Sequence, residues 1–175
     1  SGTYLITGGL GGLGLITAQQ LVDMGARSVA LVSRSGKVPQ GQGLEAFLER
    51  LHASSATIHI LRCDVSDGEQ VKKLLTQLKA KAPDQPLCGI VHAAGILDFC
   101  ELGEQTAERL DATFKPKCDG AWHLHEQTKD TNLDLFLVVS SISALVGLSR
   151  GTSYSAANHY LDALVNWRRA QGLVA

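Results

Sequence analysis

Near its start the chain reads Thr3-Tyr4-Leu5-Ile6-Thr7-Gly8-Gly9-Leu10-Gly11-Gly12-Leu13-Gly14, an apolar run followed at once by five glycines. The run Thr3–Thr7 predicts a buried strand, and the pattern near Gly12–Met24 predicts an amphipathic helix. Glycines at such a junction permit a tight turn and let a phosphate approach the free N–H groups of the helix N-terminus. The spacing satisfies Gly9-x-Gly11-x-x-Gly14 as well as Thr7-Gly8-x-x-x-Gly12-x-Gly14. In this strand-to-helix context the sequence predicts a dinucleotide pyrophosphate site rather than a merely flexible turn.

The same alternation of strand and helix continues along the chain. Further strands are expected at Ser28–Ser33, Thr57–Arg62, Leu87–His92 and Leu133–Ser140. Further helices are expected near Gly43–Ser54, Asp67–Lys81, Thr106–Thr128 and Thr152–Ala170. This order predicts an α/β fold of three layers, α/β/α, with a doubly wound parallel sheet (Rossmann fold) of strand order 3-2-1-4-5. Residues 1–175 are expected to form a single domain.

Composition excludes several classes of protein. With 175 residues, 45% apolar residues and a net charge of −1, the chain can bury a sizeable core and has no basic bias toward nucleic acid. No apolar run approaches the ~20 residues of a membrane span. The four cysteines lack paired spacing, which indicates reduced thiols, and the histidines form no metal-binding pattern. We therefore expect a cytoplasmic protein without a metal, a membrane or a nucleic-acid partner.

The residues after the second predicted strand bear on which dinucleotide would bind. Sites selective for NAD usually place an acidic residue there, whereas this chain has Ser33-Arg34. The planar guanidinium of Arg34 suits a 2′-phosphate, so NADPH is favoured over the alternative of an ordinary surface arginine. Asp64 is expected beside the adenine, although it could instead cap the next helix. The complete set of expected cofactor-binding residues is Thr7, Gly8, Gly9, Leu10, Gly11, Gly12, Leu13, Gly14, Ser33, Arg34, Asp64, Val65, Ala93, Ala94, Gly95, Lys117 and Tyr154.

Four polar residues in the second half of the chain are candidates for catalysis: Lys117, Ser141, Tyr154 and Asn158. Ser141 follows the predicted strand Leu133–Ser140, while Tyr154 and Asn158 are four residues apart and so share one face of a helix. Taken singly, each has an ordinary alternative, such as a packed tyrosine or a serine that caps a helix. Together, a phenol, an ammonium group and a hydroxyl can deliver a proton to a carbonyl. The set therefore predicts nicotinamide-dependent reduction of a ketone.

The joint pattern resembles the short-chain dehydrogenase/reductase superfamily, and one departure narrows the resemblance. Most of that superfamily carries Tyr-x-x-x-Lys, whereas here Asn158 follows Tyr154 and the lysine occurs earlier, in Lys117-Cys118-Asp119-Gly120. This exchange is similar to the ketoreductase domains of modular polyketide synthases and animal-type fatty acid synthases. The same match favours Lys117 over Lys115. Also similar to that family are Ser33-Arg34-Ser35-Gly36, His92-Ala93-Ala94-Gly95 and the segment Tyr154–Leu164.

The resemblance implies an activity and a role for each candidate. It implies reduction by NADPH of a β-ketoacyl chain, carried on the phosphopantetheine of an acyl carrier protein, in polyketide or fatty acid biosynthesis. Tyr154 would donate the proton, Lys117 would stabilise its phenolate, Ser141 would bind the carbonyl oxygen, and Asn158 would orient Lys117. Two alternatives are a free-standing short-chain carbonyl reductase and a non-catalytic structural module that binds the cofactor within a synthase.

Some features of the family pattern are missing from this chain. Family members continue past the last helix into further strands and a lid, and they carry a preceding half without cofactor. Residues 1–175 are therefore expected to be the catalytic half of a ketoreductase within a larger synthase, whose other domains would be its partners. The stereochemical fingerprints are also missing, since Phe99 stands at the aspartate position of Leu-x-Asp and Val146 stands where the opposite class has tryptophan. No product configuration is predicted.

Overall fold

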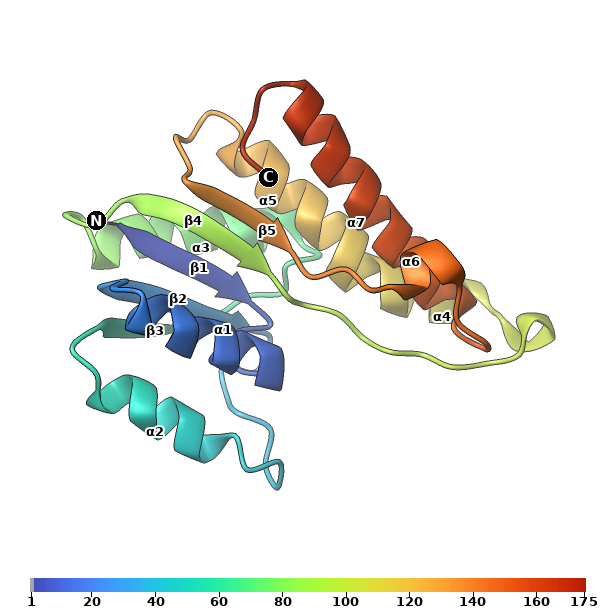
Figure 1. Ribbon diagram of the computed structural model, residues 1–175, viewed down its shortest axis with the longest axis horizontal. Coiled ribbons are helices and arrows are strands. Elements are labelled where there is room, and N and C mark those ends of the chain that lie inside the picture. The colour runs from blue at the N-terminus through green and yellow to red at the C-terminus, as the bar shows by residue number, and fades with distance from the viewer. Residues whose placement is uncertain (1) are drawn as a thin grey trace.

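The computed structural model describes residues 2–175, and within them five parallel strands form one sheet of order β3-β2-β1-β4-β5 (Figure 1). The strands are β1 (Thr3–Thr7), β2 (Ser28–Ser33), β3 (Thr57–Arg62), β4 (Leu87–His92) and β5 (Leu135–Val138). The first four have the predicted bounds, and the strand order confirms the predicted doubly wound α/β sheet.

Helices cover both faces of the sheet, which gives the predicted layers α/β/α. They are α1 (Gly12–Asp23), α2 (Glu45–Ala53), α3 (Gly68–Lys81), α4 (Ala107–Phe114), α5 (Gly120–Thr128), α6 (Ser143–Val146) and α7 (Thr152–Ala170), with a 3-10 turn η1 (Leu102–Glu104) and a π-helical turn η2 (Lys115–Asp119). Helices α1 and α2 pack on one face and α3 and α5 on the other, while α7 packs against α4, α6 and η2 (Figure 1).

The core fixes the sheet between these layers. Alternate residues of a strand face opposite sides, so Ile6 and Leu31 pack with α1 and α2, whereas Leu5 and Val32 pack with α3 and α5. All four side chains are completely buried, and each such burial stabilises the fold by about 1.5–3 kcal/mol. This packing holds the strands rigidly enough to support side chains at their ends.

Parallel pairing brings the carboxyl ends of the strands to one edge of the sheet. Thr7 lies opposite Val32 on one side and His92 on the other, and His92 lies opposite Val138. Open α/β sheets bind ligands outside this edge, at the point where the strand order reverses. The edge formed by β1 and β4 is therefore the place to look for a site.

Two predicted elements differ from the structure. The predicted strand Leu133–Ser140 is shortened to β5, because within residues 2–175 this strand pairs with β4 alone. The predicted helix Thr106–Thr128 is divided into α4, η2 and α5. Pro116 explains the division, since proline has no N–H to donate and its ring crowds the preceding turn, and the chain widens into a π turn there. The four-residue helix α6 is too short to leave a periodic pattern in the sequence.

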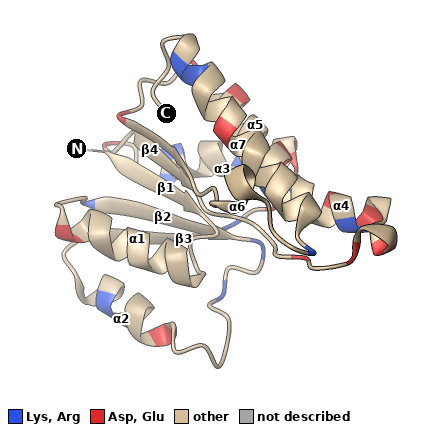
Figure 2. Ribbon diagram, turned by 45° about the vertical axis from the view of Figure 1, so that its right-hand side comes forward, with Lys and Arg blue, Asp and Glu red and all other residues tan. Residues whose placement is uncertain are grey.

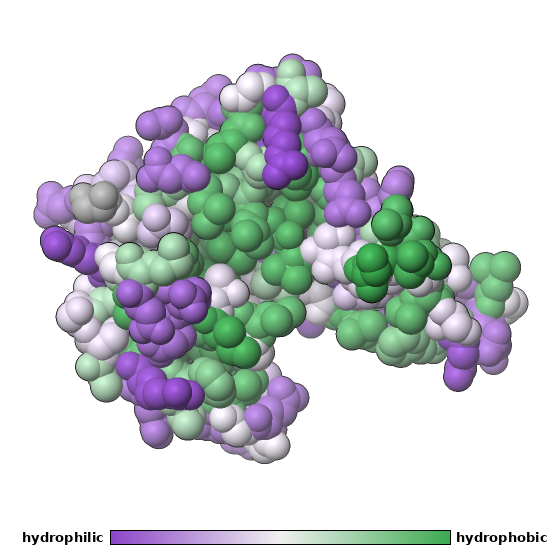
Figure 3. Space-filling model, in the orientation of Figure 1, coloured by the Kyte–Doolittle hydropathy of each residue, from purple (hydrophilic) through white to green (hydrophobic). Residues whose placement is uncertain are grey.

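The surface carries charges of both signs and an apolar patch. In the view of Figure 2, Lys and Arg are distributed over several elements. Exposed apolar side chains gather on and beside α6, where Figure 3 shows a green patch formed by Ile142, Leu145, Val146 and Leu148, which we call the α6 patch. Along residues 2–175, none of the helices combines the length and the apolar character needed to cross a membrane. The same residues contain no group of three His, Cys, Asp or Glu side chains that could hold a metal ion.

Candidate active site

The loop between β1 and α1 is shaped by positions where only glycine fits. Gly8 has a φ of +64°, and a Cβ there would lie 2.7 Å from the carbonyl oxygen of Ala93. A Cβ on Gly14 would lie 2.6 Å from the Cα of Gly9. The turn therefore folds closely against the end of β4 and presents backbone rather than side chains at the start of α1, as a pyrophosphate site requires. A Cβ on Gly12 would meet nothing closer than 3.9 Å, so space alone does not demand glycine there.

A cavity of about 540 Å³ lies at the carboxyl edge of the sheet, next to this loop. Much of the predicted cofactor set lines it: Gly8, Leu10, Gly11, Ser33, Arg34, Asp64, Val65, Ala93, Ala94 and Gly95. The remaining residues of that set lie outside its lining: Thr7, Gly9, Gly12, Leu13, Gly14, Lys117 and Tyr154. Cofactor binding stays a prediction for the whole set. A volume of this size falls in the range of small-molecule and cofactor pockets.

Two basic side chains lie at the β2 side of this cavity. Arg34 is exposed, lines the cavity and takes part in none of the ion pairs of the described chain. The turn that carries it is closed by the Gly36 N–H, which donates to Ser33 Oγ at 3.0 Å. Lys37 lines the same cavity and was missed by sequence reasoning, although its place directly after Ser33-Arg34-Ser35-Gly36 was a usable signal. Two cations without carboxylate partners suit a second phosphate group.

Asp64 lines the cavity and does not cap the following helix. Its Oδ1 accepts hydrogen bonds from the N–H and the hydroxyl of Ser66, at 3.0 and 2.7 Å. The cap of α3 is Asp67, whose side chain accepts from the N–H groups of Glu69 and Gln70. The alternative role of Asp64 as a helix cap is therefore wrong. Its contact with adenine stays a prediction.

Three of the four candidate catalytic residues are joined by hydrogen bonds. Lys117 Nζ donates to Asn158 Oδ1 at 2.8 Å and to the carbonyl oxygen of Val139 at 3.0 Å. Asn158 Nδ2 donates in turn to the carbonyl oxygen of Tyr154 at 2.9 Å. Lys117 Nζ lies 5.3 Å from the centroid of the Tyr154 ring. The lysine of η2 and the asparagine of α7 thus meet beside the tyrosine, and we call Lys117, Asn158 and Tyr154 the lysine cluster.

Burial determines the electrostatics of the lysine cluster. The Lys117 side chain is 5% exposed and Asn158 is completely buried. Removal from water lowers the pKa of Lys117 below its usual value. The hydrogen-bond partners of the ammonium group are neutral oxygens rather than a carboxylate, so its charge is not cancelled by contact. It is therefore available to stabilise negative charge on a neighbouring phenol.

Gly95 makes room for the lysine. A Cβ on Gly95 would lie 2.8 Å from Cε of Lys117. Gly95 belongs to the predicted cofactor-binding set, and it lines the cavity. The glycine therefore borders both the cavity and the lysine cluster, which places the two next to each other.

Ser141 is the candidate that no hydrogen bond joins to the lysine cluster within the described residues. Its Oγ accepts a hydrogen bond from the N–H of Ser143 at 3.2 Å, at the start of α6. The N-cap of α6 is Ile142, so this bond closes a turn just before the helix, and the Ser141 hydroxyl keeps its own hydrogen for donation. Within residues 2–175, no hydrogen bond joins Ser141 to Tyr154. The segment is tied to α7 by Ser140, whose Oγ donates to the carbonyl oxygen of Asn158 at 3.3 Å.

Lys115 is paired with Asp111 and is not part of the lysine cluster. Its side chain is exposed, and Nζ lies 2.8 Å from Asp111 Oδ2 in the preceding turn. This agrees with the preference for Lys117. Lys115 does, however, line the cavity.

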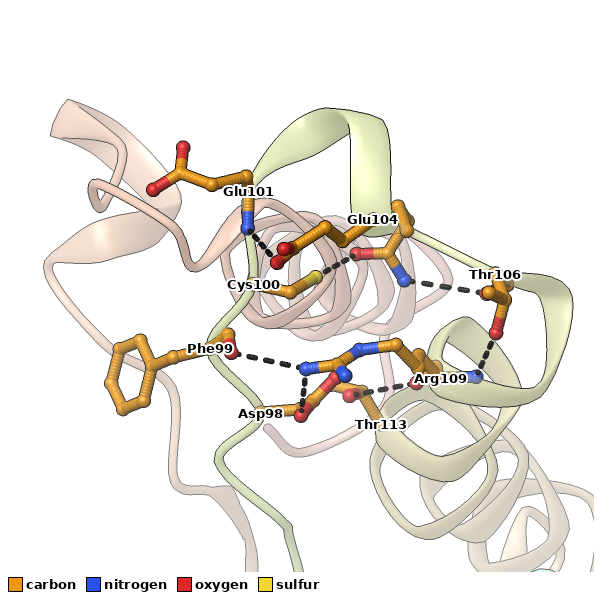
Figure 4. Close-up of polar contacts among 9 residues, drawn as sticks. Asp98, Phe99, Cys100, Glu101, Glu104, Thr106, Arg109 and Thr113 are labelled. Carbon is orange, nitrogen blue, oxygen red and sulfur yellow. Dashed lines mark hydrogen bonds and ion pairs between the residues drawn. The ribbon is translucent and has the colours of Figure 1, made fainter.

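An ion pair holds the loop that follows β4 (Figure 4). Arg109 Nη2 lies 2.7 Å from Asp98 Oδ1 and also donates to the carbonyl oxygen of Phe99 at 3.0 Å. The ring of Phe99 points away from Arg109 and is 50% exposed. A reciprocal cap between Glu101 and Glu104 continues the network (Figure 4). Arg109 therefore joins the start of α4 to the segment that follows β4.

Known protein sequences place these features in a family. The family model described as KR domain matches residues 2–175. The chain is 44% identical over 175 residues to polyketide synthase GfsB of Streptomyces halstedii, covering 99% of this chain and 3% of that protein. It is 39% identical over 176 residues to mycoketide-CoA synthase of Mycobacterium tuberculosis, covering 100% of this chain and 4% of that protein. The chain thus spans a small part of the curated relatives it matches.

Solved structures agree with the sequence relatives. A ketoreductase from the first module of phoslactomycin biosynthesis in a Streptomyces species gives a TM-score of 0.90 at 38% identity, over 99% of this chain and 39% of that chain. A structure of A-type ketoreductases from a modular polyketide synthase gives a TM-score of 0.87 at 39% identity, over 98% of this chain and 35% of that chain. The chain therefore belongs to the KR domain family, with the short-chain dehydrogenase/reductase fold that its sequence resemblance predicted.

Proposed function

We propose that this chain is the cofactor-binding, catalytic part of an NADPH-dependent ketoreductase that reduces a β-ketoacyl thioester to a β-hydroxyacyl thioester in polyketide biosynthesis. The observation that carries the proposal is the lysine cluster, in which a buried ammonium group lies 2.8 Å from Asn158 Oδ1 and 5.3 Å from the Tyr154 ring centroid. Burying a lysine opposes its charge and is therefore costly. A module that only bound the cofactor would have no use for such an arrangement beside its cavity.

The residues around the cavity fit NADPH. The glycine loop offers backbone at a helix N-terminus for a pyrophosphate, and Arg34 and Lys37 offer two cations for the 2′-phosphate. Bound NADPH would supply the hydride that the substrate carbon accepts.

The chain's own residues would handle the proton and the developing negative charge. The Tyr154 hydroxyl would donate a proton to the substrate oxygen, a step that contributes about 10²–10⁴-fold. The Ser141 hydroxyl would donate a hydrogen bond to the same oxygen and hold it in line. Lys117 would stabilise the phenolate that Tyr154 leaves behind, and Asn158 would keep Lys117 in place.

The surroundings of the site support an acyl substrate delivered by another domain. The α6 patch presents exposed apolar side chains on and beside α6, and α6 packs against α7, the helix that carries Tyr154. An apolar surface there suits an acyl chain. The matched relatives are polyketide synthases of far greater length, which favours a chain carried on the phosphopantetheine of an acyl carrier protein over a free ketone. The other domains of such a synthase would be the partners of this one.

A product assay on the full-length protein tests the proposal. The protein is incubated with NADPH and either a β-ketoacyl thioester or a simple cyclic ketone, and the products are identified by mass spectrometry. We expect the β-hydroxyacyl thioester to form faster than the alcohol of the cyclic ketone. Faster reduction of the cyclic ketone would favour a free-standing carbonyl reductase. NADPH binding without reduction of either compound would favour a non-catalytic module.

A further inference from the structure

His92, the last residue of β4, lies between the glycine loop and the turn that carries Lys117. It is 1% exposed. Its Nδ1 lies 2.7 Å from Thr7 Oγ1, and its Nε2 lies 3.0 Å from the backbone carbonyl oxygen of Lys117. One imidazole therefore connects the end of β1 to the backbone of the candidate catalytic lysine.

The hydrogen-bond partners determine which nitrogen carries the proton. A carbonyl oxygen can only accept, so Nε2 must carry the hydrogen that it donates to Lys117. Nδ1 then has a free lone pair, and the Thr7 hydroxyl donates to it. Burial lowers the pKa of His92 to about 4, so the ring is neutral near pH 7 and keeps this arrangement. Both ring nitrogens are satisfied, and neither is free for proton transfer to a substrate.

The turn η2 leaves space for the imidazole of His92 because Gly120 has no side chain. A Cβ on Gly120 would lie 2.9 Å from Cε1 of His92. The Gly120 N–H also donates to the carbonyl oxygen of Lys117, so the same oxygen is held from two sides. This accounts for glycine in Lys117-Cys118-Asp119-Gly120, because a side chain there would displace the imidazole from Lys117.

We infer that His92 is a positioning residue that fixes the backbone of Lys117 against the sheet, so that Lys117 Nζ reaches Asn158 and the Tyr154 ring. Lys117 lies in a π turn with a proline near its start, where regular helix hydrogen bonds constrain the backbone less. The hydrogen bond from His92 supplies an additional constraint there. The inference rests on the proposed function of Lys117, and it assigns His92 no contact with substrate or cofactor.

Two variants of His92 separate its two bonds. In His92→Gln the side-chain amide extends to the position of Nε2 and can still donate to the Lys117 carbonyl oxygen. In His92→Asn the shorter amide reaches only the position of Nδ1 and retains a partner for Thr7. A displacement of about 1 Å in a catalytic group can cost about 10²-fold, so we expect the Asn variant to lose turnover by about ten- to a hundredfold while the Gln variant stays much closer to the parent.

The measurement is turnover of the full-length protein at saturating NADPH and thioester, with NADPH affinity and thermal unfolding recorded alongside. We expect both variants to bind NADPH as the parent does. Equal turnover of the Gln and Asn variants, whether high or low, overturns the inference. If the Asn variant does not fold, Gly120→Ala takes its place, because its methyl group would push the ring from Lys117. Turnover equal to that of the parent in Gly120→Ala would likewise overturn it.

Lys117→Met, measured in the same series, separates this inference from the proposed function. Normal turnover of Lys117→Met contradicts the proposed function itself. Loss of turnover in Lys117→Met with full turnover in His92→Asn contradicts only the positioning by His92.

Discussion

The two sides of the carboxyl edge of the sheet are built in opposite ways. On the β1–β2 side, the glycines Gly8 and Gly14 allow the backbone to pack closely. The cations on this side, Arg34 and Lys37, are exposed and line the cavity. On the β4–β5 side the groups are buried and already bonded to one another, with Lys117 Nζ donating to two oxygens. One side is open to receive a ligand, whereas the other is organised before any ligand arrives.

Mutations on the two sides should therefore affect different properties of the protein. Exposed cations that meet a phosphate only on binding should contribute to affinity. Buried groups that are preorganised around a reacting atom should contribute to turnover, because their geometry is already set when the substrate binds. Each variant below is therefore read first by the quantity expected for its side of the edge, affinity on the β1–β2 side and turnover on the β4–β5 side.

Lys117→Met should give the largest effect on the preorganised side. Removing the ammonium group deprives the phenolate of Tyr154 of its neighbouring cation, so turnover at saturating NADPH should fall by about 10²–10⁴-fold, the contribution of acid-base catalysis. Normal turnover with reduced NADPH affinity in Lys117→Met would contradict the assignment of the buried side to turnover.

Lys79→Met is the matched control for this variant. Lys79 is exposed on α3, away from the cavity lining, and its loss should leave turnover unchanged. Lys115 is unsuitable as a control because it lines the cavity. Since Lys117→Met leaves buried acceptors at Val139 and Asn158, thermal unfolding is measured for both variants.

Acidification should weaken the fold through His92. Its pKa in the fold is about 4, below the ~6.5 of an unfolded chain. Between these values the unfolded chain binds a proton that the fold excludes, so the contribution of His92 to the free energy of unfolding is complete above pH ~6.5 and is lost as the pH falls toward 4. The loss should be about 3 kcal/mol.

Urea unfolding of the full-length protein at pH 7, 5.5 and 4.5 measures this slope. His59 and His125 also have lowered pKa values because of burial, so the parent is compared with His92→Gln, which should have a shallower slope. His52→Gln, on the exposed surface of α2, should keep the parent slope. Equal slopes in all three proteins would show that His92 does not titrate as described.

Arg34→Ala should give a smaller effect, confined to affinity. A charge-assisted contact with the 2′-phosphate contributes about 1.5–3 kcal/mol, so the preference for NADPH over NADH should fall by at least tenfold. Fluorescence titration with both cofactors measures it. Arg27→Ala, at the amino end of β2, should leave the preference intact. Equal affinities for the two cofactors in the parent protein would remove the role assigned to Arg34.

Much of the fold was predictable because its signals are local. Four strands begin and end at the residues predicted from the alternation of apolar runs with helical patterns. The glycine spacing marks the loop between β1 and α1. Tyr154 and Asn158 were predicted to share a face because four residues are about one turn of a helix. Lys117 Nζ lies close to both side chains, which bears this out. Sequence reasoning succeeds where a single element carries the whole pattern.

The rest depends on contacts between elements distant in the sequence. The His92–Lys117 bond joins β4 to η2, and the space for the Lys117 side chain is supplied by Gly95. Neither contact can be predicted from a fixed spacing of residues along the sequence. The π turn at Pro116 was hidden within a longer helical pattern, and the engagement of Ser141 by Ser143 depends on the unpredicted helix α6. Side-chain partners across elements become visible only once the register of the sheet is known.

The most direct test of the account is single-turnover reduction of a β-ketoacyl thioester by the full-length Tyr154→Phe variant at saturating NADPH. This substitution removes only the hydroxyl, so thermal unfolding and NADPH affinity should match the parent while the rate falls by about 10²–10⁴-fold. Tyr4→Phe, in β1 at the opposite end of the sheet from the site, is the matched control and should reduce the thioester at the parent rate. A near-normal rate for Tyr154→Phe with intact NADPH binding would contradict the assignment of Tyr154 as the proton donor.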